Sequence, residues 1–216
     1  MSIRKTPFAE GEYYHLYNRG NAKRKIFLDK QDYFRFIKLL FYCNSSKTIN
    51  FRDISKNFDP GEPLVAIGTF CLMPNHFHIL IKEINEGGIT KFMQRLGTAY
   101  VKYFNKRYEI TGGLFEGKFK SEYINSDRHL KYLYSYIHLN PIKIVDKSWK
   151  EGGLKNKAKT YSFLEGYPYS SYPIYMRKQN LISEQGKILQ PKVFPGYFKT
   201  SLAHKNELYS WLKFDK

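Results

Sequence analysis

Cysteine, acidic residues and long apolar runs are all scarce in this chain of 216 residues. The two cysteines, Cys43 and Cys71, stand in apolar surroundings without CxxC spacing, so they indicate buried free thiols in a reducing compartment rather than a disulfide framework. No apolar run is long enough to cross a bilayer, and the first residues do not form a signal peptide. We therefore expect a soluble, cytoplasmic protein without a membrane partner.

The shortage of acidic residues leaves a strongly basic chain. It holds 36 Lys and Arg against 19 Asp and Glu, which gives a formal net charge of +17, and 18% of its residues are aromatic. Lys and Arg bind phosphates, and aromatic rings stack on unpaired bases, so this composition favours a nucleic-acid partner. A tyrosine-rich β core is the alternative explanation for the aromatic excess.

The spacing of apolar residues predicts an α+β fold. Residues 64–83 contain two apolar runs around the break Met73-Pro74-Asn75, which indicates a β-hairpin. Strands joined by a tight turn are antiparallel, so we expect an antiparallel sheet with helices packed on one side. The other predicted elements are a strand over 12–19, a helix from an N-cap at Asp29 or Asp32 to Tyr42, a helix over 89–108, a strand over 114–124, a helix over 128–139, a mobile loop over 147–159 and a helix near 206–212.

Two histidines open the second strand of the hairpin. Side chains alternate across a strand, so His76 and His78 face the same side and Phe77 the other. Two imidazoles side by side on a rigid strand can bind a metal ion. The alternative is a pair of half-buried histidines that hydrogen bond within the fold.

A tyrosine and an amide lie one turn apart at the end of the helix over 128–139. Tyr136 and Asn140 are four residues apart and therefore share a helix face. Pro141 disfavours helical geometry at Asn140, so we expect Asn140 at or just past the helix end, with its amide oxygen free to point outward. On the helix pattern alone, Tyr136 can equally be a half-buried aromatic of an amphipathic helix.

Five separated blocks resemble one family in the order in which they occur. They are YHLYNRGNAKRKIF near the N-terminus, His76-Phe77-His78 at the hairpin, GLFEGKFKS in the basic strand, YIHLNPIK at the helix end and YPYSSYPIY near residue 170. Together they resemble the HUH single-tyrosine transposases of the insertion-sequence single-strand family, most closely the REP-associated tyrosine transposases. The resemblance implies a ferredoxin- or RRM-like HUH nuclease core over 1–145, followed by a basic C-terminal extension over 146–216 that is partly loop and packed on the core.

The resemblance also implies roles for individual residues. His76, His78 and Asn140 would hold a divalent metal, and Tyr136 would be the nucleophile. Relatives often carry Gln and Arg where Glu116 and Lys118 stand here, and Arg where Lys143 stands. The basic strand is therefore the part in which this chain departs most from the pattern.

The implied chemistry is DNA strand transfer. The oxygen of Tyr136 would attack a backbone phosphorus, displace a 3′-hydroxyl and leave a 5′-phosphotyrosine that can later be rejoined to another end. A tyrosine has a pKa of about 10, so a metal that polarises the phosphate would help. Imidazole ligands favour Mn²⁺, and Mg²⁺ is the abundant candidate. A helix-borne tyrosine reaches an intact duplex poorly, which predicts single-stranded or hairpin DNA as the substrate.

Several further assignments follow from charge and position. Tyr14 or His15 can stack on a base or pack in the core. We expect a nucleoid-associated protein, and both a monomer and a homodimer are compatible with the sequence. A basic nucleic-acid-binding module without chemistry and a phosphodiesterase that uses water are the alternative functions. The candidate DNA-binding residues are Asn18, Arg19, Lys23, Arg24, Lys25, Arg95, Lys102, Lys118 and Lys120.

Overall fold

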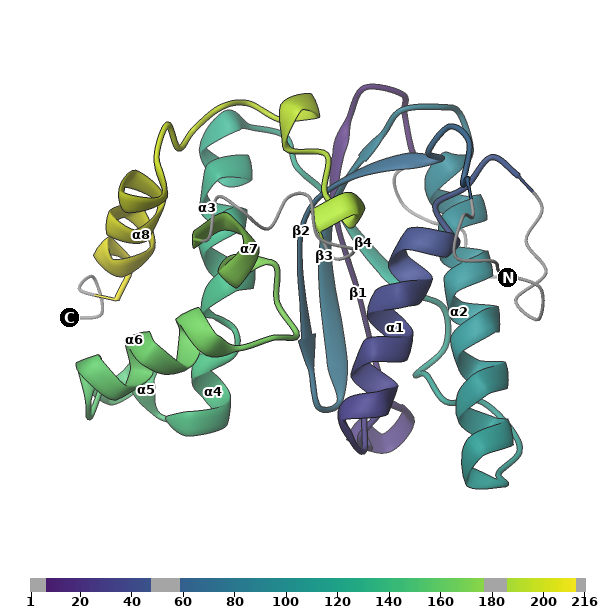
Figure 1. The fold of residues 1–216 in the computed structure, drawn as a ribbon, viewed down its shortest axis with the longest axis horizontal. Coiled ribbons are helices and arrows are strands. Elements are labelled where there is room, and N and C mark those ends of the chain that lie inside the picture. The colour runs from purple at the N-terminus through teal and green to yellow at the C-terminus, as the bar shows by residue number, and fades with distance from the viewer. Residues whose placement is uncertain (1–6, 48–58, 177–185, 213–216) are drawn as a thin grey trace.

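A four-stranded antiparallel sheet organises the residues that the computed structural model describes, which are 7–47, 59–176 and 186–212. Its strand order is β2-β3-β1-β4, so the hairpin forms one edge and the N-terminal strand lies in the interior (Figure 1). The sheet confirms the predicted α+β class. The strands are β1 (Tyr13–Arg19), β2 (Val65–Met73), β3 (His76–Glu83) and β4 (Lys120–Tyr123).

The hairpin forms where the sequence predicts it. Met73 pairs with His76 across the turn, and the register continues to Val65 opposite Glu83, with one irregularity between Ile67 and Thr69. The strand predicted over 114–124 is much shorter, because only Lys120–Tyr123 pairs continuously with β1. Before it the chain makes a single bridge, between Phe115 and Gly20, and otherwise runs irregularly.

Helices α1 (Lys30–Tyr42) and α2 (Gly88–Tyr108) pack on one face of the sheet, as predicted (Figure 1). Their apolar stripes, including Phe36 and Phe92, join alternate strand residues such as Phe77 and Ile79 in one buried cluster. This burial follows from the spacing of apolar side chains, which recur about every 3.6 residues in the helices and every second residue in the strands. Asp29 caps α1, whereas Asp32 lies inside the helix.

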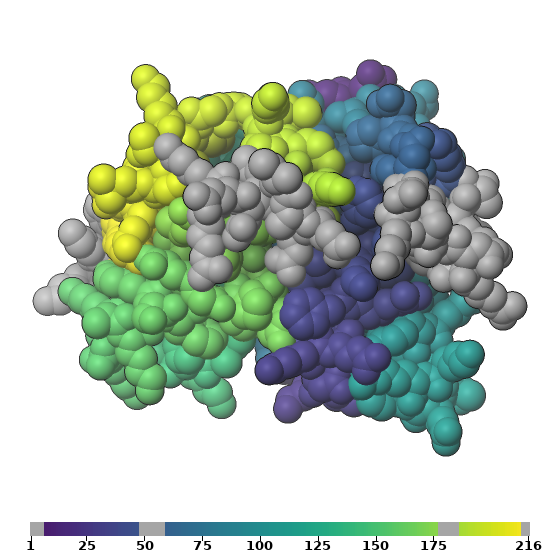
Figure 2. All heavy atoms as spheres, viewed as in Figure 1, coloured from purple at the N-terminus to yellow at the C-terminus, as the bar shows by residue number. Residues whose placement is uncertain are grey.

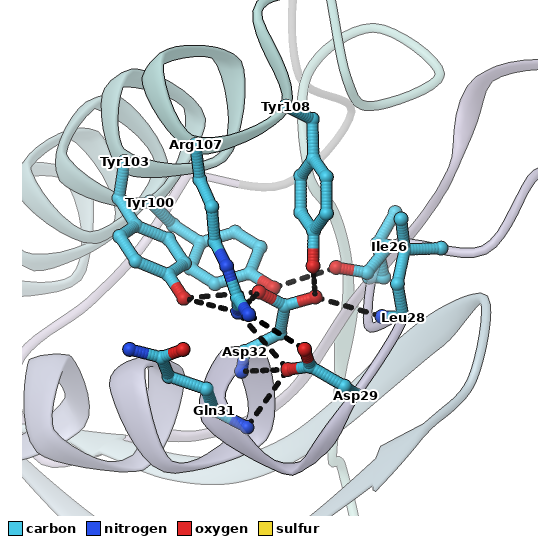
Figure 3. Close-up of polar contacts among 9 residues, drawn as sticks. All are labelled: Ile26, Leu28, Asp29, Gln31, Asp32, Tyr100, Tyr103, Arg107 and Tyr108. Atoms are coloured by element: carbon cyan, nitrogen blue, oxygen red, sulfur yellow. Dashed lines mark hydrogen bonds and ion pairs between the residues drawn. The ribbon is translucent and has the colours of Figure 1, made fainter.

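The side chain of Asp32 is the centre of a polar cluster that joins α1 to α2 (Figure 3). It is fully buried, and its two oxygens accept hydrogen bonds from Leu28 N, Tyr103, Arg107 and Tyr108 at 2.7–3.0 Å. A buried carboxylate is tolerated only when its lone pairs are used, and here four donors use them. The cluster therefore fixes the start of α1 against the end of α2.

Helix α3 (Asp127–Leu139) packs against the opposite face of the sheet (Figure 1). Ser126 accepts from His129 N and caps its start. Leu130, Leu133 and Ile137 pack here with strand residues such as Leu80. Helices thus cover both faces, and α3 lies on the face toward which His76 and His78 point.

Short helices follow in the stretch that we predicted to be a mobile loop over 147–159, and that prediction is wrong. Trp149 from this lysine-rich stretch is buried in a third apolar cluster, in which it packs with residues such as Leu164. The helices here are α4 (Ile142–Val145), α5 (Trp149–Gly152), α6 (Lys157–Gly166) and α7 (Tyr172–Met176). Two short 3-10 turns follow, η3 (Gly186–Ile188) and η4 (Pro191–Val193). The last helix, α8 (Ser201–Ser210), begins earlier than the helix predicted near 206–212.

The C-terminal elements occupy one side of the molecule and the α1–α2 layer the other (Figure 2). Between them, the outer edge of β2 is hydrogen bonded by residues far along the chain. Leu72 N donates to Tyr169 O, Ser171 N donates to Phe70 O and Gln190 N donates to Ile67 O, at 2.9–3.0 Å. No helix in the described part of the chain combines the length and the apolar character that a bilayer crossing needs.

Candidate metal and nucleophile site

Strands β1 and β3 place three imidazoles on one face of the sheet. His76 and His78 share this face because of strand alternation, and their ring centroids are 5.0 Å apart. The neighbouring strand adds His15, whose ring lies 5.0 Å from that of His78. The sequence does not place His15 beside the histidine pair, because its position there depends on the pairing register of β1 with β3.

Helix α3 brings Tyr136 onto the same histidines. The Tyr136 ring centroid lies 5.6 Å from that of His78 and 5.9 Å from that of His15. The side chain is half-buried, so one part of it rests on the sheet and the rest faces a pocket. The structure therefore brings together the candidate nucleophile and the histidine pair, which lie far apart in the sequence.

Asn140 stands at the end of α3, as predicted, but its amide is buried rather than pointing outward, with 3% of the residue exposed. Nδ2 donates to the Tyr136 carbonyl oxygen at 3.0 Å. Burial lowers the pKa of His76 and raises that of Tyr136. The Asn140 side chain is close enough to both residues to oppose each of these shifts in part. Oδ1 accepts no hydrogen bond of normal geometry from any described residue.

Hydrogen bonds to Nδ1 of His76 and His78 determine which nitrogen of each ring carries the proton and which keeps a lone pair. His76 Nδ1 lies 2.7 Å from Asn75 Oδ1, and because an amide oxygen only accepts, Nδ1 carries the proton and Nε2 keeps a lone pair. His78 Nδ1 lies 2.8 Å from His15 Nε2, and donation by His78 likewise frees its Nε2. His15 Nδ1 in turn lies 3.8 Å from Glu122 Oε2.

Burial keeps these histidines neutral. It lowers the pKa of His76 and of His15 to about 4, and that of His78 well below its usual 6.5, with nearby positive charge adding to the effect on His76. Neutral imidazoles carry the lone pair that a metal requires. Burial also raises the pKa of Tyr136 above 10, so this phenol is protonated at neutral pH and does not attack without assistance.

These residues fit a divalent metal. Two imidazole nitrogens and one orphaned amide oxygen would supply three donors to such an ion, whereas no group of three His, Cys, Asp or Glu that could hold a metal occurs in the described residues. A buried oxygen without a donor costs about 1–3 kcal/mol, which a metal ion would relieve. The fit therefore depends on Asn140.

Only some of the predicted DNA-binding residues surround this site. A pocket of about 340 Å³ is lined by His76, His78, Tyr136, Asn18, Arg19, Lys23, Lys120 and Lys143, among others. Arg19 is paired with Glu116, one of the residues that depart from the family pattern. The Asn18 amide is used inside the protein, since Nδ2 donates to Gly117 O at 3.2 Å and Oδ1 accepts from Arg19 N at 2.9 Å.

The other predicted DNA-binding residues lie outside that pocket. Arg24 donates to Gly113 O at 2.8 Å, and Arg95 donates to Ser45 O on the α1–α2 side of the sheet. Lys118 lines a separate groove between α2 and the segment before β4. Tyr14 is 2% exposed and belongs to the core, and His15 is 5% exposed against His78, so both pack inside the protein.

The antiparallel sheet thus carries a histidine pair beneath a helix-borne tyrosine. The family described as "Transposase IS200 like" matches residues 10–140, and the chain belongs to this family. It is therefore a transposase, which makes it an enzyme that cuts DNA and transfers its strands.

One solved structure supports the fold. The chain is similar to one described as "Structure of the REP associates tyrosine transposase bound to a REP hairpin", with a TM-score of 0.52 and 13% identity over 91% of this chain and 92% of that one. A bacterial tRNA(His) guanylyltransferase-like protein in complex with ATP also matches, with a TM-score of 0.39 and 11% identity over 76% and 72% of the two chains. A search of curated proteins finds no match.

Proposed function

We propose that the protein cuts and rejoins single-stranded or hairpin DNA through a covalent bond to Tyr136. The observation that carries this proposal is the meeting of Tyr136 and the histidine pair at one pocket with a basic rim, with the side chain of Asn140 close behind His76 and Tyr136. The similar tyrosine transposase is bound to a REP hairpin, which supports the choice of substrate.

His76, His78 and Asn140 would hold a divalent ion, either Mn²⁺ or Mg²⁺. When bound, the ion supplies positive charge to the non-bridging oxygens of the scissile phosphate. The protein contributes position: burial keeps both imidazoles neutral, and the contacts to Asn75 and His15 fix the rings. A fixed ligand set costs no reorganisation when the reaction occurs.

Tyr136 supplies the nucleophilic oxygen. Its O–P bond forms as the P–O3′ bond breaks, the phenolic proton is lost to solvent and the leaving 3′ oxygen takes up a proton. The products are a 5′-phosphotyrosine and a free 3′-hydroxyl, and attack by a 3′-hydroxyl on the phosphotyrosine reverses the step. Lys143 and Lys120 line the same pocket and would offset the charge of the bound strand.

The test uses hairpin-bearing single-stranded DNA and Mn²⁺, with the covalent protein–DNA adduct read on a denaturing gel. The wild-type protein should form the adduct and Tyr136→Phe should form none. The matched control is Tyr123→Phe, an exposed tyrosine on β4 whose hydroxyl donates to Glu12, and it should keep the adduct.

Three outcomes would change the assignment. An adduct on the Tyr136→Phe protein would remove Tyr136 as the nucleophile. Cleavage by the wild type without any adduct would indicate hydrolysis by water. Binding without cleavage of any hairpin sequence, with any divalent ion, would indicate a nucleic-acid-binding module.

A further inference from the structure

A second pocket borders Tyr136, and the chemistry above does not use its remaining walls. Its volume is about 290 Å³, at the lower end of ligand cavities, which suits a fragment the size of one base. Half of the residues that line it come after residue 140 in the sequence, where the match to the family ends. The lining residues are Tyr132, Tyr136, Leu139, Asn140, Lys143, Trp149, Lys150 and Trp211.

The walls of this pocket, which we call the tryptophan pocket, are aromatic. The chain has two tryptophans, Trp149 and Trp211, and both line it although they are far apart in sequence. The Tyr132 ring lies 4.8 Å from that of Trp211 and 6.0 Å from that of Tyr136. Rings of this kind stack on unpaired nucleic-acid bases, with about 1–3 kcal/mol lost per base when one is replaced by alanine.

One wall also carries a buried donor without an acceptor. Trp149 is 6% exposed, and its indole Nε1 has no hydrogen-bond partner among the described residues. An indole nitrogen only donates, so a ligand in the pocket that reaches Nε1 would satisfy it by supplying an acceptor. The carbonyl oxygens and ring nitrogens of a nucleobase are such acceptors.

The charge at the pocket suits a nucleotide. Lys150 Nζ lies 5.6 Å from the Trp149 ring centroid and 5.9 Å from that of Tyr136. Lys143 lines both this pocket and the histidine pocket, and burial followed by the charge of Lys150 lowers its pKa. Among the described residues, no acidic side chain lines the tryptophan pocket, so the basic rim of the histidine pocket continues into it.

We propose that the tryptophan pocket binds one unpaired base of the DNA strand, next to the phosphate that Tyr136 attacks. The proposal rests on the proposed function for its location, since Tyr136 and Lys143 border both pockets. Seating a base here would hold the strand so that the adjacent phosphate lies over the histidines. The C-terminal residues would then take part in substrate binding and not only in folding.

The test measures binding without cleavage, so that it is independent of the chemistry. Tyr136→Phe protein is titrated with a short oligothymidylate without metal, and tryptophan fluorescence is recorded because both tryptophans line the pocket. Oligothymidylate should quench the fluorescence. An abasic oligonucleotide of the same length and charge should bind without comparable quenching. Oligothymidylate that binds without quenching would overturn the proposal.

Variants then separate stacking from structure, with binding now followed by fluorescence anisotropy of labelled DNA. Trp211→Ala should weaken oligothymidylate binding about 5- to 150-fold and leave abasic binding unchanged. Trp149→Phe keeps a ring in the core but loses the donor, and should weaken oligothymidylate binding about 2- to 12-fold. Phe34→Ala, an exposed aromatic on α1, should change neither and serves as the matched control.

Two results would contradict the proposal. If Trp211→Ala and Trp149→Phe weaken both oligonucleotides equally, or weaken neither, the pocket does not hold a base. Failure of the proposed function gives a different pattern, because the wild type would then form no adduct while the base-dependent binding and quenching persist. Thermal melting of each variant separates loss of binding from loss of folding.

Discussion

Two polar clusters lie on opposite faces of the same sheet, one around Asp32 and one around Asn140. Both central side chains are buried, with 0% and 3% of the residue exposed. The Asp32 oxygens accept four hydrogen bonds, whereas Asn140 Oδ1 accepts none from the described residues. A cluster in which every oxygen is hydrogen bonded stabilises the fold. An oxygen without a hydrogen bond keeps a lone pair that a ligand such as a metal ion can use.

Loss of the satisfied cluster should have the largest effect. Asp32→Ala leaves Arg107 and two tyrosine hydroxyls without this acceptor, so we expect the free energy of unfolding to fall by about 3–5 kcal/mol in urea denaturation. Mn²⁺ affinity of the folded protein should not change. The exposed Asp59, which pairs with Lys47, provides the control Asp59→Ala, with an expected loss below about 1 kcal/mol. A loss equally small at Asp32 would break the comparison.

The unsatisfied cluster should respond in the opposite way. Asn140→Ala removes an orphaned oxygen and one hydrogen bond to the Tyr136 carbonyl, so the free energy of unfolding should change by less than about 1 kcal/mol. Mn²⁺ binding, measured by titration calorimetry without DNA, should weaken by more than the factor of about 10 to 100 that is typical of a residue behind a ligand. Unchanged Mn²⁺ affinity would remove Asn140 from the ligand set.

His15 lies behind a proposed ligand, and its loss should have a smaller effect on the metal than the loss of Asn140. His15→Phe keeps a ring in place but removes the acceptor for His78 Nδ1, so Mn²⁺ affinity should fall about 10- to 100-fold. His15→Gln offers an amide oxygen at a similar reach and should recover part of the loss. Equal affinity of the wild type and the Phe variant would show that His15 only packs.

The smallest effect is expected at the rim of the site. The Glu116 carboxylate pairs with the Arg19 guanidinium, which lowers the pKa of Glu116. We expect this ion pair to compete with a DNA phosphate for Arg19. Glu116→Gln should tighten binding of hairpin DNA about 2- to 5-fold, as expected for an exposed ion pair. It should also steepen the salt dependence of the binding constant, because one more phosphate contact forms. Weaker binding would show that Glu116 positions Arg19 for DNA.

The parts of the fold that follow local rules could be predicted from the sequence. Alternation placed His76 and His78 on one side, and the spacing of Tyr136 and Asn140 placed them on one helix face. The face of the sheet on which α3 packs could not be predicted, because it depends on contacts between distant residues. The His15–His78 contact depends in the same way on strand register.

Apart from a helix near 206–212, the C-terminal part could not be predicted, for a different reason. Lys147–Lys159 is rich in lysine and glycine, and its one large aromatic residue, Trp149, gives no period. Helix α6 buries Thr160 and Leu164 and α8 buries His204 and Leu208, so neither has a continuous apolar stripe. Their helical state is set by packing against α3, α4 and α7 rather than by local pattern.

The hydrogen bonds that residues 169–171 and 190 make along β2 also limit how copies of this chain can associate. An open edge strand is a template on which another chain can add a strand, and proteins protect themselves by covering it. Here the chain covers the outer edge of its own β2. A second copy can extend the sheet across that edge only after it displaces this segment, so a continuous intermolecular sheet through β2 is disfavoured.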